Sequence, residues 1–273
     1  MMMKIAIDFS KTAQQNALHY FDQAKKLKQK IKGAEEGMQK VQSKLAELAK
    51  KDHSLPQKKS PQLLRKKEWF EKFHWCYTRH GLLVVGGRDA HSNEALVKKH
   101  LEDRDWYFHA DIHGAPHCVL KEGKARAKKE DMEDAAAFAA LFASGWKKGL
   151  FSVRVYSVSN EQVSKKAPAG ESLGKGAFMI YGERKWFDPS MKMGIGVQKA
   201  GEANRIMSGP YEAIRKHCSI IAEIIPGEKT KTEVAKSYLK WLQKKLPHAQ
   251  ELTLDEITAA LPNGSLALHV ASA

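Results

Sequence analysis

Between residues 13 and 48, apolar side chains recur at alternating spacings of four and three residues without a slip. The positions in this seam are Ala13, Ala17, Tyr20, Ala24, Leu27, Ile31, Ala34, Met38, Val41, Leu45 and Leu48. A repeat of this kind is typical of a coiled coil. It predicts one long helix over residues 10–51, and at about 1.5 Å per residue that helix would measure roughly 60 Å.

A seam of this length needs a partner. The next predicted helix, residues 62–75, is much shorter, and no later predicted helix matches the first in length. We therefore expect self-association through residues 13–48 or pairing with a separate protein. The outer face is basic, because residues 1–60 hold 13 Lys against 6 acids, a net charge of +7. That face is either a solvated surface or a contact for an anionic partner.

The whole chain of 273 residues is basic, with 46 Lys and Arg against 31 Asp and Glu and a net charge of +15. This balance favours nucleic acid as a partner, with an acidic membrane surface or an acidic protein as alternatives. No apolar run reaches the roughly 18 residues of a membrane span, and Lys4 and Asp8 interrupt any signal-peptide core. Three widely spaced cysteines, Cys76, Cys118 and Cys218, fit a reducing cytoplasm rather than a disulfide framework or structural zinc.

Composition and pattern divide the chain into three predicted parts. Residues 1–60 form the coiled-coil arm and a linker rich in Pro, Ser and Lys, residues 61–200 form an α+β domain, and residues 201–273 form a small α/β tail. The predicted fold class is therefore α+β, with a long coiled-coil helix in front.

Local signals predict the elements of the second and third parts. Helices are expected at residues 62–75, 88–101, 131–149 and 230–246, and strands at residues 81–87, 106–113, 118–122, 151–158, 177–182, 219–225 and 265–270. Asp89 or Ser92 is expected to cap the second of these helices. Thr253 and Glu256 form a capping-box pattern that predicts a further helix.

Residues 106–113, WYFHADIH, alternate apolar and polar side chains, as a strand with one buried and one accessible face does. On such a strand His109, Asp111 and His113 share the accessible face. Three interpretations stay open: a Zn, Fe or Mn site, an acid–base centre, or a polar patch that either faces RNA or is a hydrogen-bonded structural feature. The outer two Cα atoms of such a set lie about 13 Å apart, so three-way ligation would need a bend or an additional ligand. The candidates for that ligand are His74, His91 and His117.

The stretch GGRDAHSNE places two glycines before the predicted helix at residues 88–101, with Arg88 and Asp89 at its start. Glycines let the backbone approach a ligand, a helix N-terminus attracts phosphate, and Arg88 adds a fork of donors. The alternative is a strand-to-helix turn with an ion pair from Arg88 to Asp89 or Asp111. We expect Asp111 to be the central acceptor of a polar patch, with Arg88 and one His as partners.

A third candidate is the loop QVSKKAPAGESLGKG, residues 162–176, which holds Lys165, Lys166 and Lys175 among small residues. Flexible basic loops of this kind follow RNA backbones. An ordinary solvated loop has the same composition, so the pattern favours RNA without excluding that alternative.

Long stretches of the chain resemble the NFACT family. They are NALHYFDQAKKLKQKIKGAEEGMQKV, EWFEKFHWCYTRHGLLVVGGRDAHSNEALVKKHL, HADIHGAP and EQVSKKAPAGESLGKGAFMIYGER, within residues 8–200, and the tail stretches GPYEAIRKHC and IIPGEKTK are similar to archaeal members. The resemblance implies a non-catalytic, RNA-binding role in ribosome-associated quality control. We expect no cofactor, and no metal at His109, Asp111 and His113, because their spacing and basic surroundings disfavour a dication. Large ribosomal subunits with a stalled peptidyl-tRNA, rRNA and tRNA are the implied partners. The residues expected to contact RNA are Arg88, Asp89, His109, Asp111, His113, Lys165, Lys166, Lys175 and Arg184.

The chain departs from the family pattern at its start. Family members usually carry a large N-terminal domain and a helix-hairpin-helix segment before the coiled coil, whereas this chain begins at the coiled coil. We therefore expect a fragment, or one half of a split protein whose N-terminal partner binds the seam, and tailing by this chain alone is in doubt. Tyr181 replaces the more usual Arg, and Ser172 a more usual aromatic residue, which weakens phosphate or base contact. Two other functions stay open: a metal-dependent hydrolase or nuclease that uses His109, Asp111 and His113, and a scaffold that binds protein through the seam.

Overall fold

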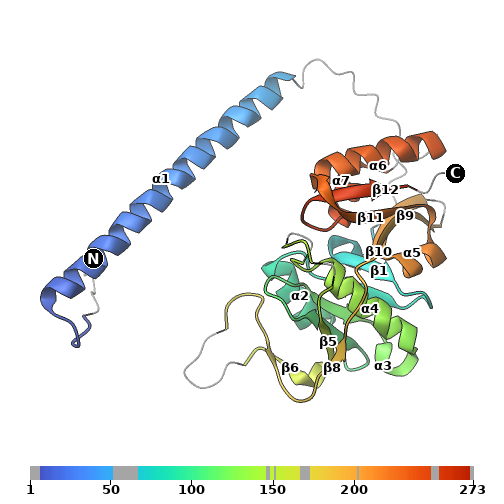
Figure 1. Cartoon of the computed structure of the whole chain (residues 1–273), viewed down its shortest axis with the longest axis horizontal. Helices are drawn as coiled ribbons and strands as arrows, with labels where there is room; N and C mark the ends of the chain where they lie inside the picture. The colour runs from blue at the N-terminus through green and yellow to red at the C-terminus, as the bar shows by residue number, and fades with distance from the viewer. Residues whose placement is uncertain are drawn as a thin grey trace. The chain divides into compact units, whose positions relative to one another are not determined.

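A computed structural model of the chain describes residues 7–51, 67–145, 148–150, 152–166, 173–201, 203–246 and 252–270. The chain splits into two units, Met1–Lys59 and Ser60–Ala273 (Figure 1). Among the described residues, no helix is both long enough and apolar enough to cross a membrane. The division into three functional parts, with boundaries near residues 60 and 200, stays a prediction.

The first unit consists of the helix α1 (Ala13–Lys51), as predicted. Thr12 and Gln15 cap its start reciprocally, with the Gln15 N–H donating to Thr12 Oγ1 and the Thr12 N–H donating to Gln15 Oε1. Four seam residues, Leu27, Ile31, Met38 and Val41, are between 57% and 64% exposed. No second helix lies beside them in the described part of this unit, so the coiled coil itself stays a prediction.

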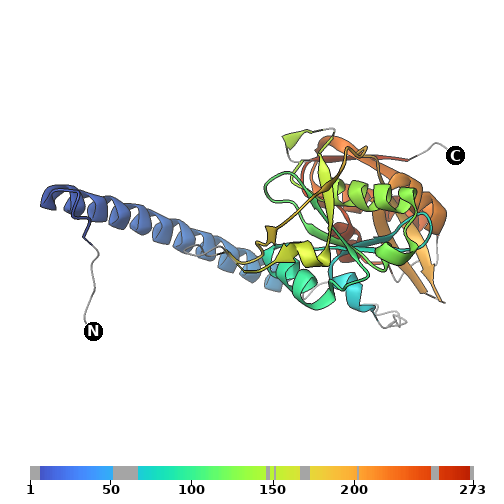
Figure 2. The same cartoon turned by 90° about the horizontal axis from the view of Figure 1, so that it is seen from below.

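The second unit begins with a six-stranded antiparallel sheet of order β1-β2-β4-β3-β5-β8. Its strands are β1 (His74–Tyr77), β2 (Leu83–Gly86), β3 (Trp106–Ala110), β4 (His117–Leu120), β5 (Val155–Ser159) and β8 (Lys185–Phe187). Helix α4 (Lys129–Leu141) packs against β2, β3, β4 and β5, and Figure 2 shows it lying across these strands. Helix α2 (Ala90–His100) contacts β2 and β4. The smaller elements are η2 (Trp69–Lys72), α3 (Gly123–Arg126), η4 (Asn160–Gln162), β6 (Val163–Ser164) and β7 (Met179–Ile180).

Both faces of this sheet are covered, which corrects the expectation of an accessible face on β3. Phe108 packs in the cluster that contains Phe138 of α4, whereas Tyr107 packs with Val97 of α2. Tyr107 and Phe108 are both fully buried. The strand also ends at Ala110 rather than at His113. His109 and His113 therefore border a cavity, whereas Asp111 is exposed beyond the end of the strand.

Two predicted helices differ from the structure. The described part of residues 62–75 forms only the single turn η2 and then strand β1, because Trp75 pairs with Val85 of β2 and this pairing overrides the helical spacing of the aromatic residues; residues 62–66 lie outside the described residues. Helix α4 starts at Lys129 and ends at Leu141, short of the predicted end at residue 149. Asp131 still takes part in its cap, since its carboxylate accepts the Lys128 N–H.

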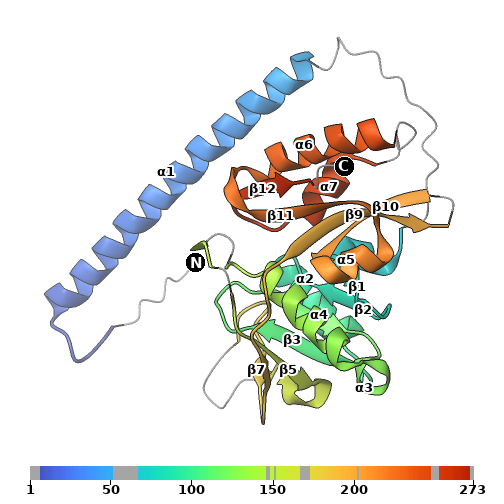
Figure 3. The ribbon, with the colours of Figure 1, turned by 45° about the vertical axis from the view of Figure 1, so that its right-hand side comes forward.

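A four-stranded antiparallel sheet of order β10-β9-β11-β12 completes the unit (Figure 3). Its strands are β9 (Met193–Ala200), β10 (Ala203–Pro210), β11 (Ser219–Lys229) and β12 (Leu266–His269), and its helices are α5 (Tyr211–His217), α6 (Lys231–Lys245) and α7 (Leu254–Ala260). The β9–β10 hairpin was not predicted, and β11 continues with a bulge through Pro226 and Gly227, beyond its predicted end at residue 225. The capping boxes of α6 and α7 form at Thr230 and Thr253. Helix α4 and strand β1 both contact β10, which joins the two sheets.

Candidate nucleic-acid interface

A cavity of about 500 Å³ opens at the end of the first sheet where α2 begins. The β2–α2 turn, strand β3, the β3–β4 loop and the segment before β7 supply most of its lining, and Asn263 comes from the segment between α7 and β12. Five of the predicted contact residues line it: Arg88, Asp89, His109, His113 and Lys175. Segments that lie far apart in the sequence of the second unit therefore meet at this cavity.

The start of α2 forms one wall, and its local chemistry explains the second of the two glycines, Gly87. The Asp89 carboxylate accepts the Ser92 N–H at 2.7 Å, so Asp89 rather than Ser92 is the N-cap. Asn93 Oδ1 accepts the His117 N–H at 3.0 Å. A Cβ on Gly87 would lie 2.0 Å from that oxygen, so a side chain there would displace Asn93. The glycine allows α2 to lie close to β4 and opens the backbone at the pocket.

Arg88 does not form the expected ion pair with Asp111 or Asp89. Its Nη2 donates instead to the backbone oxygen of Phe73 at 2.9 Å and more weakly to that of Glu71 at 3.4 Å. Burial of the guanidinium lowers the pKa of Arg88, and the nearby Asp89 charge opposes this shift. The prediction that Asp111 and Arg88 organise a polar patch is therefore wrong, because carbonyl groups of η2 and β1 hold the guanidinium.

Two imidazoles and a tyrosine line the floor of the pocket. His109 stands opposite His117 in the register of β3 and β4, with ring centroids 4.9 Å apart. The Tyr107 hydroxyl hydrogen-bonds to His117 Nδ1. Burial lowers the pKa of His109 to about 4 and that of His117 to about 3. Both rings are therefore neutral at pH 7 and act as hydrogen-bonding and stacking groups rather than as cations.

Asp111 and His113 lie in the turn that follows β3, and both are exposed. The Asp111 N–H donates to the Arg154 carbonyl at 2.7 Å, and the His113 carbonyl accepts from Ser144 Oγ at 2.8 Å. His113 reaches the pocket, whereas Asp111 is not among its lining residues. No group of three His, Cys, Asp or Glu side chains suited to a metal ion occurs among the described residues.

Apart from Arg88, the predicted basic residues divide into one that is paired and three that are open. Lys165 Nζ pairs with Glu94 at 3.3 Å and donates to the carbonyls of Gly174 and Ala177 at 2.9 and 3.0 Å, which ties this loop to α2. The remaining three, Lys166, Lys175 and Arg184, are exposed. None of those three has a carboxylate within 4.0 Å in the described part of the chain.

Aromatic rings continue the pocket towards Arg184. Tyr156 of β5 lines the cavity 5.8 Å from His109, and the Arg184 guanidinium lies 4.5 Å above the Tyr156 ring. Phe178 lies edge-on to His117 at 5.3 Å. Rings, neutral imidazoles and nearby cations suit an unpaired base with its phosphate.

Several lining residues were not among the predicted contacts: His74, Asn93, Tyr107, Tyr156, His117, Phe178 and Asn263. A hairpin interpretation of HADIHGAPH pairs His109 with His117 and would have indicated the second imidazole. No local pattern marks Asn263, because it reaches the pocket from the C-terminal part of the chain.

Comparison with known sequences identifies the domain. The family described as "NFACT protein RNA binding domain" matches residues 72–182, a range that contains every lining residue of the pocket except Asn263. The chain is 36% identical over 187 residues to "Archaeal Rqc2 homolog aRqcH" of Methanocaldococcus jannaschii, an alignment that covers 67% of this chain and 28% of that protein. It is 34% identical over 183 residues to "Ribosome quality control complex subunit NEMF" of Homo sapiens, covering 65% of this chain and 17% of NEMF.

A solved structure, the C-terminal region of the fibronectin/fibrinogen-binding protein of Streptococcus suis, aligns at a TM-score of 0.38 with 20% identity, covering 66% of this chain and 76% of that one. A likeness at that score carries no argument about function. The matched region spans less than a third of each of the two curated relatives. The specific motifs, the domain match and the relatives agree, and the chain therefore belongs to the NFACT family.

Proposed function

We propose that this chain is a non-catalytic RNA-binding factor of ribosome-associated quality control, which docks on large ribosomal subunits that hold a stalled peptidyl-tRNA. The pocket is the observation that supports RNA binding, because it sets neutral rings beside Arg88 and Lys175. The net charge of +15 adds the long-range attraction that a polyanion requires. The names of the relatives supply the cellular process.

The three predicted parts would divide this work. Residues 61–200 would contact rRNA or tRNA, residues 201–273 would support that domain, and the arm of residues 1–60 would bind a second copy or a separate N-terminal NFACT partner through its seam. The exposed seam residues of α1 support the last proposal. Three free cysteines are consistent with a place in the cytoplasm.

The geometry does not favour a hydrolase built on His109, Asp111 and His113. Strand β3 ends before Asp111, so the three side chains do not share one strand face. His109 instead makes its ring contacts with Tyr107, His117 and Tyr156. A protein scaffold remains compatible with the seam and would not exclude RNA binding by the second unit.

Cosedimentation with purified large ribosomal subunits tests the proposal. We expect the chain to pellet with subunits at low salt and to be released steeply as salt rises. The double variant Lys175→Glu/Arg184→Glu should weaken binding by about tenfold or more, because each reversal repels a phosphate. The matched control Lys240→Glu/Lys244→Glu changes the same charge on the exposed face of α6 and should bind nearly as the parent does. Failure of the parent chain to pellet at low salt would contradict the proposal.

A further inference from the structure

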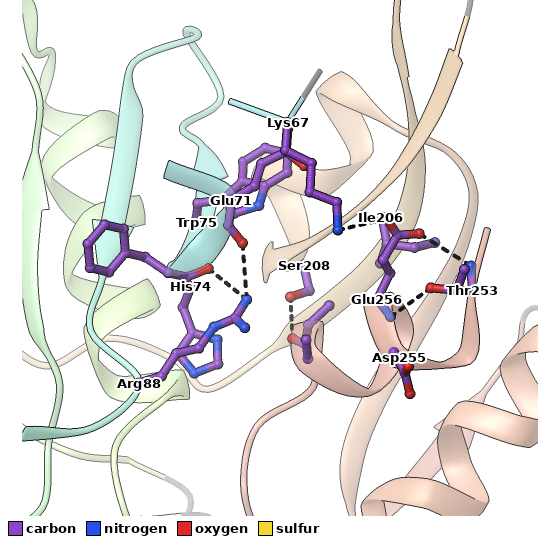
Figure 4. Close-up of a pocket in the computed structure, with 13 residues that line it drawn as sticks. Lys67, Glu71, His74, Trp75, Arg88, Ile206, Ser208, Thr253, Asp255 and Glu256 are labelled. Carbon is purple, nitrogen blue, oxygen red and sulfur yellow. Dashed lines mark hydrogen bonds and ion pairs between the residues drawn. The ribbon is translucent and has the colours of Figure 1, made fainter. Parts of the chain in front are cut away.

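The pocket shares one wall with a second cavity of about 340 Å³, lined by β1, β10 and α7. His74 and Arg88 form that shared wall, and Figure 4 shows the Arg88 guanidinium beside the His74 ring. On the far side of the second cavity, Thr253, Glu256 and Ser208 are already paired, and Asp255 is an exposed acid. The Glu256 carboxylate accepts a hydrogen bond from the Thr253 N–H and forms an ion pair with Lys67. The Ser208 hydroxyl donates to the Ala260 carbonyl. The buried polar atom of this cavity that has no partner in the described structure, His74 Nδ1, lies at the shared wall.

Three basic side chains from three separate elements lie at or near this wall: His74 and Arg88 line both cavities, and Lys231, which lines neither, is linked to the pocket through Asn263. His74 comes from β1, Arg88 from the β2–α2 turn and Lys231 from the first turn of α6. The charges of Arg88 and Lys231 both lower the pKa of His74, after burial as the largest cause. Burial and then the charge of Arg88 lower the pKa of Lys231 to about 8. The charges of Arg88, which is exposed, and of the half-buried Lys231 thus act on each other and on His74, and this repulsion costs free energy unless an anion offsets it.

No carboxylate neutralises this cluster. In the described part of the chain, neither Arg88 nor Lys231 has a carboxylate within 4.0 Å. Asp89 is the acid that acts on Arg88 from a distance, and its own oxygen is bound by the Ser92 N–H and hydroxyl. Positive charge therefore accumulates at this wall without the acidic partner that a structural ion pair would have.

His74 also carries a polar atom without a partner. Its Nδ1 is buried and makes no hydrogen bond within the described structure. The ring is fixed by stacking on Phe142, with centroids 4.1 Å apart. A buried polar atom left in this way costs about 1–3 kcal/mol, and a ligand that accepts or donates a hydrogen bond would recover it.

Asn263 supplies a neutral donor next to the cations. Its Oδ1 accepts from Lys231 Nζ at 3.5 Å, and the residue lines the pocket together with His74 and Arg88. Asn263 itself is exposed. The Asn263 Nδ2 group is then the end of that amide which can donate to a bound anion.

We propose that His74, Arg88, Lys231 and Asn263 form an anion site that holds one phosphate group of the bound RNA. The proposal rests on the RNA-binding function above and extends it, because Lys231 and Asn263 lie outside residues 72–182, the range of the RNA-binding domain. The C-terminal part of the chain thus completes the interface. A phosphate here would accept from the guanidinium, the ammonium and the amide while the base enters the pocket above His109 and His117.

Salt titration of RNA binding tests the site with a matched pair of variants. Lys231→Gln and Lys236→Gln remove the same charge from the same helix, but Lys236 is exposed and is not part of the cluster. For a single-stranded RNA probe, we expect Lys231→Gln to lower the slope of log affinity against log salt by about 0.7. Lys236→Gln should leave the slope unchanged, and Lys231→Arg should restore it. An unchanged thermal midpoint for Lys231→Gln would show that the variant is folded.

A second arm uses inorganic phosphate without RNA. The ammonium of Lys231 is followed by NMR as pH rises, with chloride at equal ionic strength as the control. We expect phosphate to raise the pKa of Lys231 from about 8, since the anion offsets the charge of Arg88. The Arg88→Gln variant should lose this response.

The outcomes separate the two proposals. If the parent chain binds RNA and the Lys231→Gln variant keeps the full salt slope, the anion site is wrong while the proposed function stands. If the parent chain binds neither RNA nor ribosomal subunits, the proposed function fails, and the phosphate titration alone tests the anion site. A rise in the pKa of Lys231 then supports a site for free phosphate, and no rise overturns the site.

Discussion

Helices α1 and α4 both carry rows of apolar residues, yet they bury them to opposite extents. In α4 the residues Ala135, Ala136, Phe138, Ala139, Ala140 and Leu141 are 0% exposed beneath two sheets. In α1 Leu27, Ile31, Met38 and Val41 are more than half exposed. Periodicity identifies a helix in both places, whereas burial depends on what packs against it. The second unit supplies its own core, whereas the apolar face of α1 is left exposed.

The largest effect expected from this contrast is on stability. The Phe138 ring fills the space beside Gly86 and Gly209, where an added Cβ would lie 2.9 Å and 3.5 Å from it. Phe138→Ala should therefore cost the second unit about 3–5 kcal/mol, whereas Ile31→Ala in α1 should cost less than about 0.5 kcal/mol in the unpartnered chain. Urea unfolding followed by tryptophan fluorescence measures the second unit, because all six Trp residues lie after residue 60. Equal losses from the two variants would contradict the contrast.

The next largest effect is expected in acid, which should destabilise the second unit. The imidazoles of His109 and His117 have folded pKa values of about 4 and 3, below the ordinary value of 6.5. The unfolded chain then binds protons that the folded chain does not, so their contribution to stability is complete above pH 6.5 and falls as pH drops towards 4. The slope for each histidine approaches about 1.4 kcal/mol per pH unit at most. His74 acts in the same direction, since burial lowers its pKa as well.

Urea unfolding between pH 7 and pH 5 measures this loss before carboxylates titrate. His117→Gln keeps a hydrogen-bonding group next to Tyr107 but removes one titrating ring, so its decline should be shallower than that of the parent. A decline of equal steepness in His117→Gln would remove His117 from the explanation. The exposed His19 of α1 provides the control position, and His19→Gln should leave the pH profile of the second unit unchanged.

Self-association would show what covers the seam of α1. Burial of Leu27 and Ile31 against a second helix should contribute about 2–3 kcal/mol to pairing for the two together. We expect the weight-average mass in sedimentation equilibrium to rise with concentration, and the variant Leu27→Gln/Ile31→Gln to stay monomeric. Gln29→Ala lies off the seam and serves as the control. A parent chain that stays monomeric at high concentration with α1 fully helical would point to a different protein as the partner.

Local chemistry predicted the elements whose signals are local. The Asp89 cap begins α2, and the Thr253–Glu256 capping box begins α7. The β9–β10 hairpin has no comparable signal, because glycines take the place of branched side chains along it. Gly194 and Gly196 are needed there since Ile214 and Cys218 lie within 3.0 Å of where a Cβ would stand. Tertiary packing, which a single sequence does not display, selected these residues.

The sequence predicted separate segments of the candidate site, but not how they come together. Residues 88–89, 109–113 and 175 were each proposed separately, and the fold brings members of all three to one pocket. The predicted ion pair of Arg88 was wrong because the partners of its guanidinium are the backbone carbonyls of Glu71 and Phe73. Every residue has such a carbonyl, so the sequence does not indicate which ones accept a hydrogen bond. Lys231 and Asn263 were absent from the prediction because contacts between distant parts of the chain follow only from the fold.

The smallest effect is expected from single lysine charges, and it distinguishes structural from RNA-contacting cations. The sequence predicts that neutralising Lys165 and Lys166 together flattens the salt slope of RNA binding by about two. The geometry revises the pair, because Glu94 already neutralises Lys165, whereas Lys166 and Lys175 are exposed and have no carboxylate within 4.0 Å in the described residues. Lys166→Gln/Lys175→Gln should therefore flatten the slope by about 1.4 for single-stranded RNA, at 0.7 for each phosphate contact, without loss of stability.

Lys165→Gln should show the reverse pattern. Its slope should stay close to that of the parent, while protease cleavage of the loop should accelerate as the bonds to Gly174 and Ala177 are lost. The variant Lys26→Gln/Lys30→Gln carries the same change in charge on α1. If this variant flattens the salt slope of RNA binding as much as Lys166→Gln/Lys175→Gln does, the arm also contacts phosphates. Helix α1 would then bind RNA with its basic face and a protein partner with its seam.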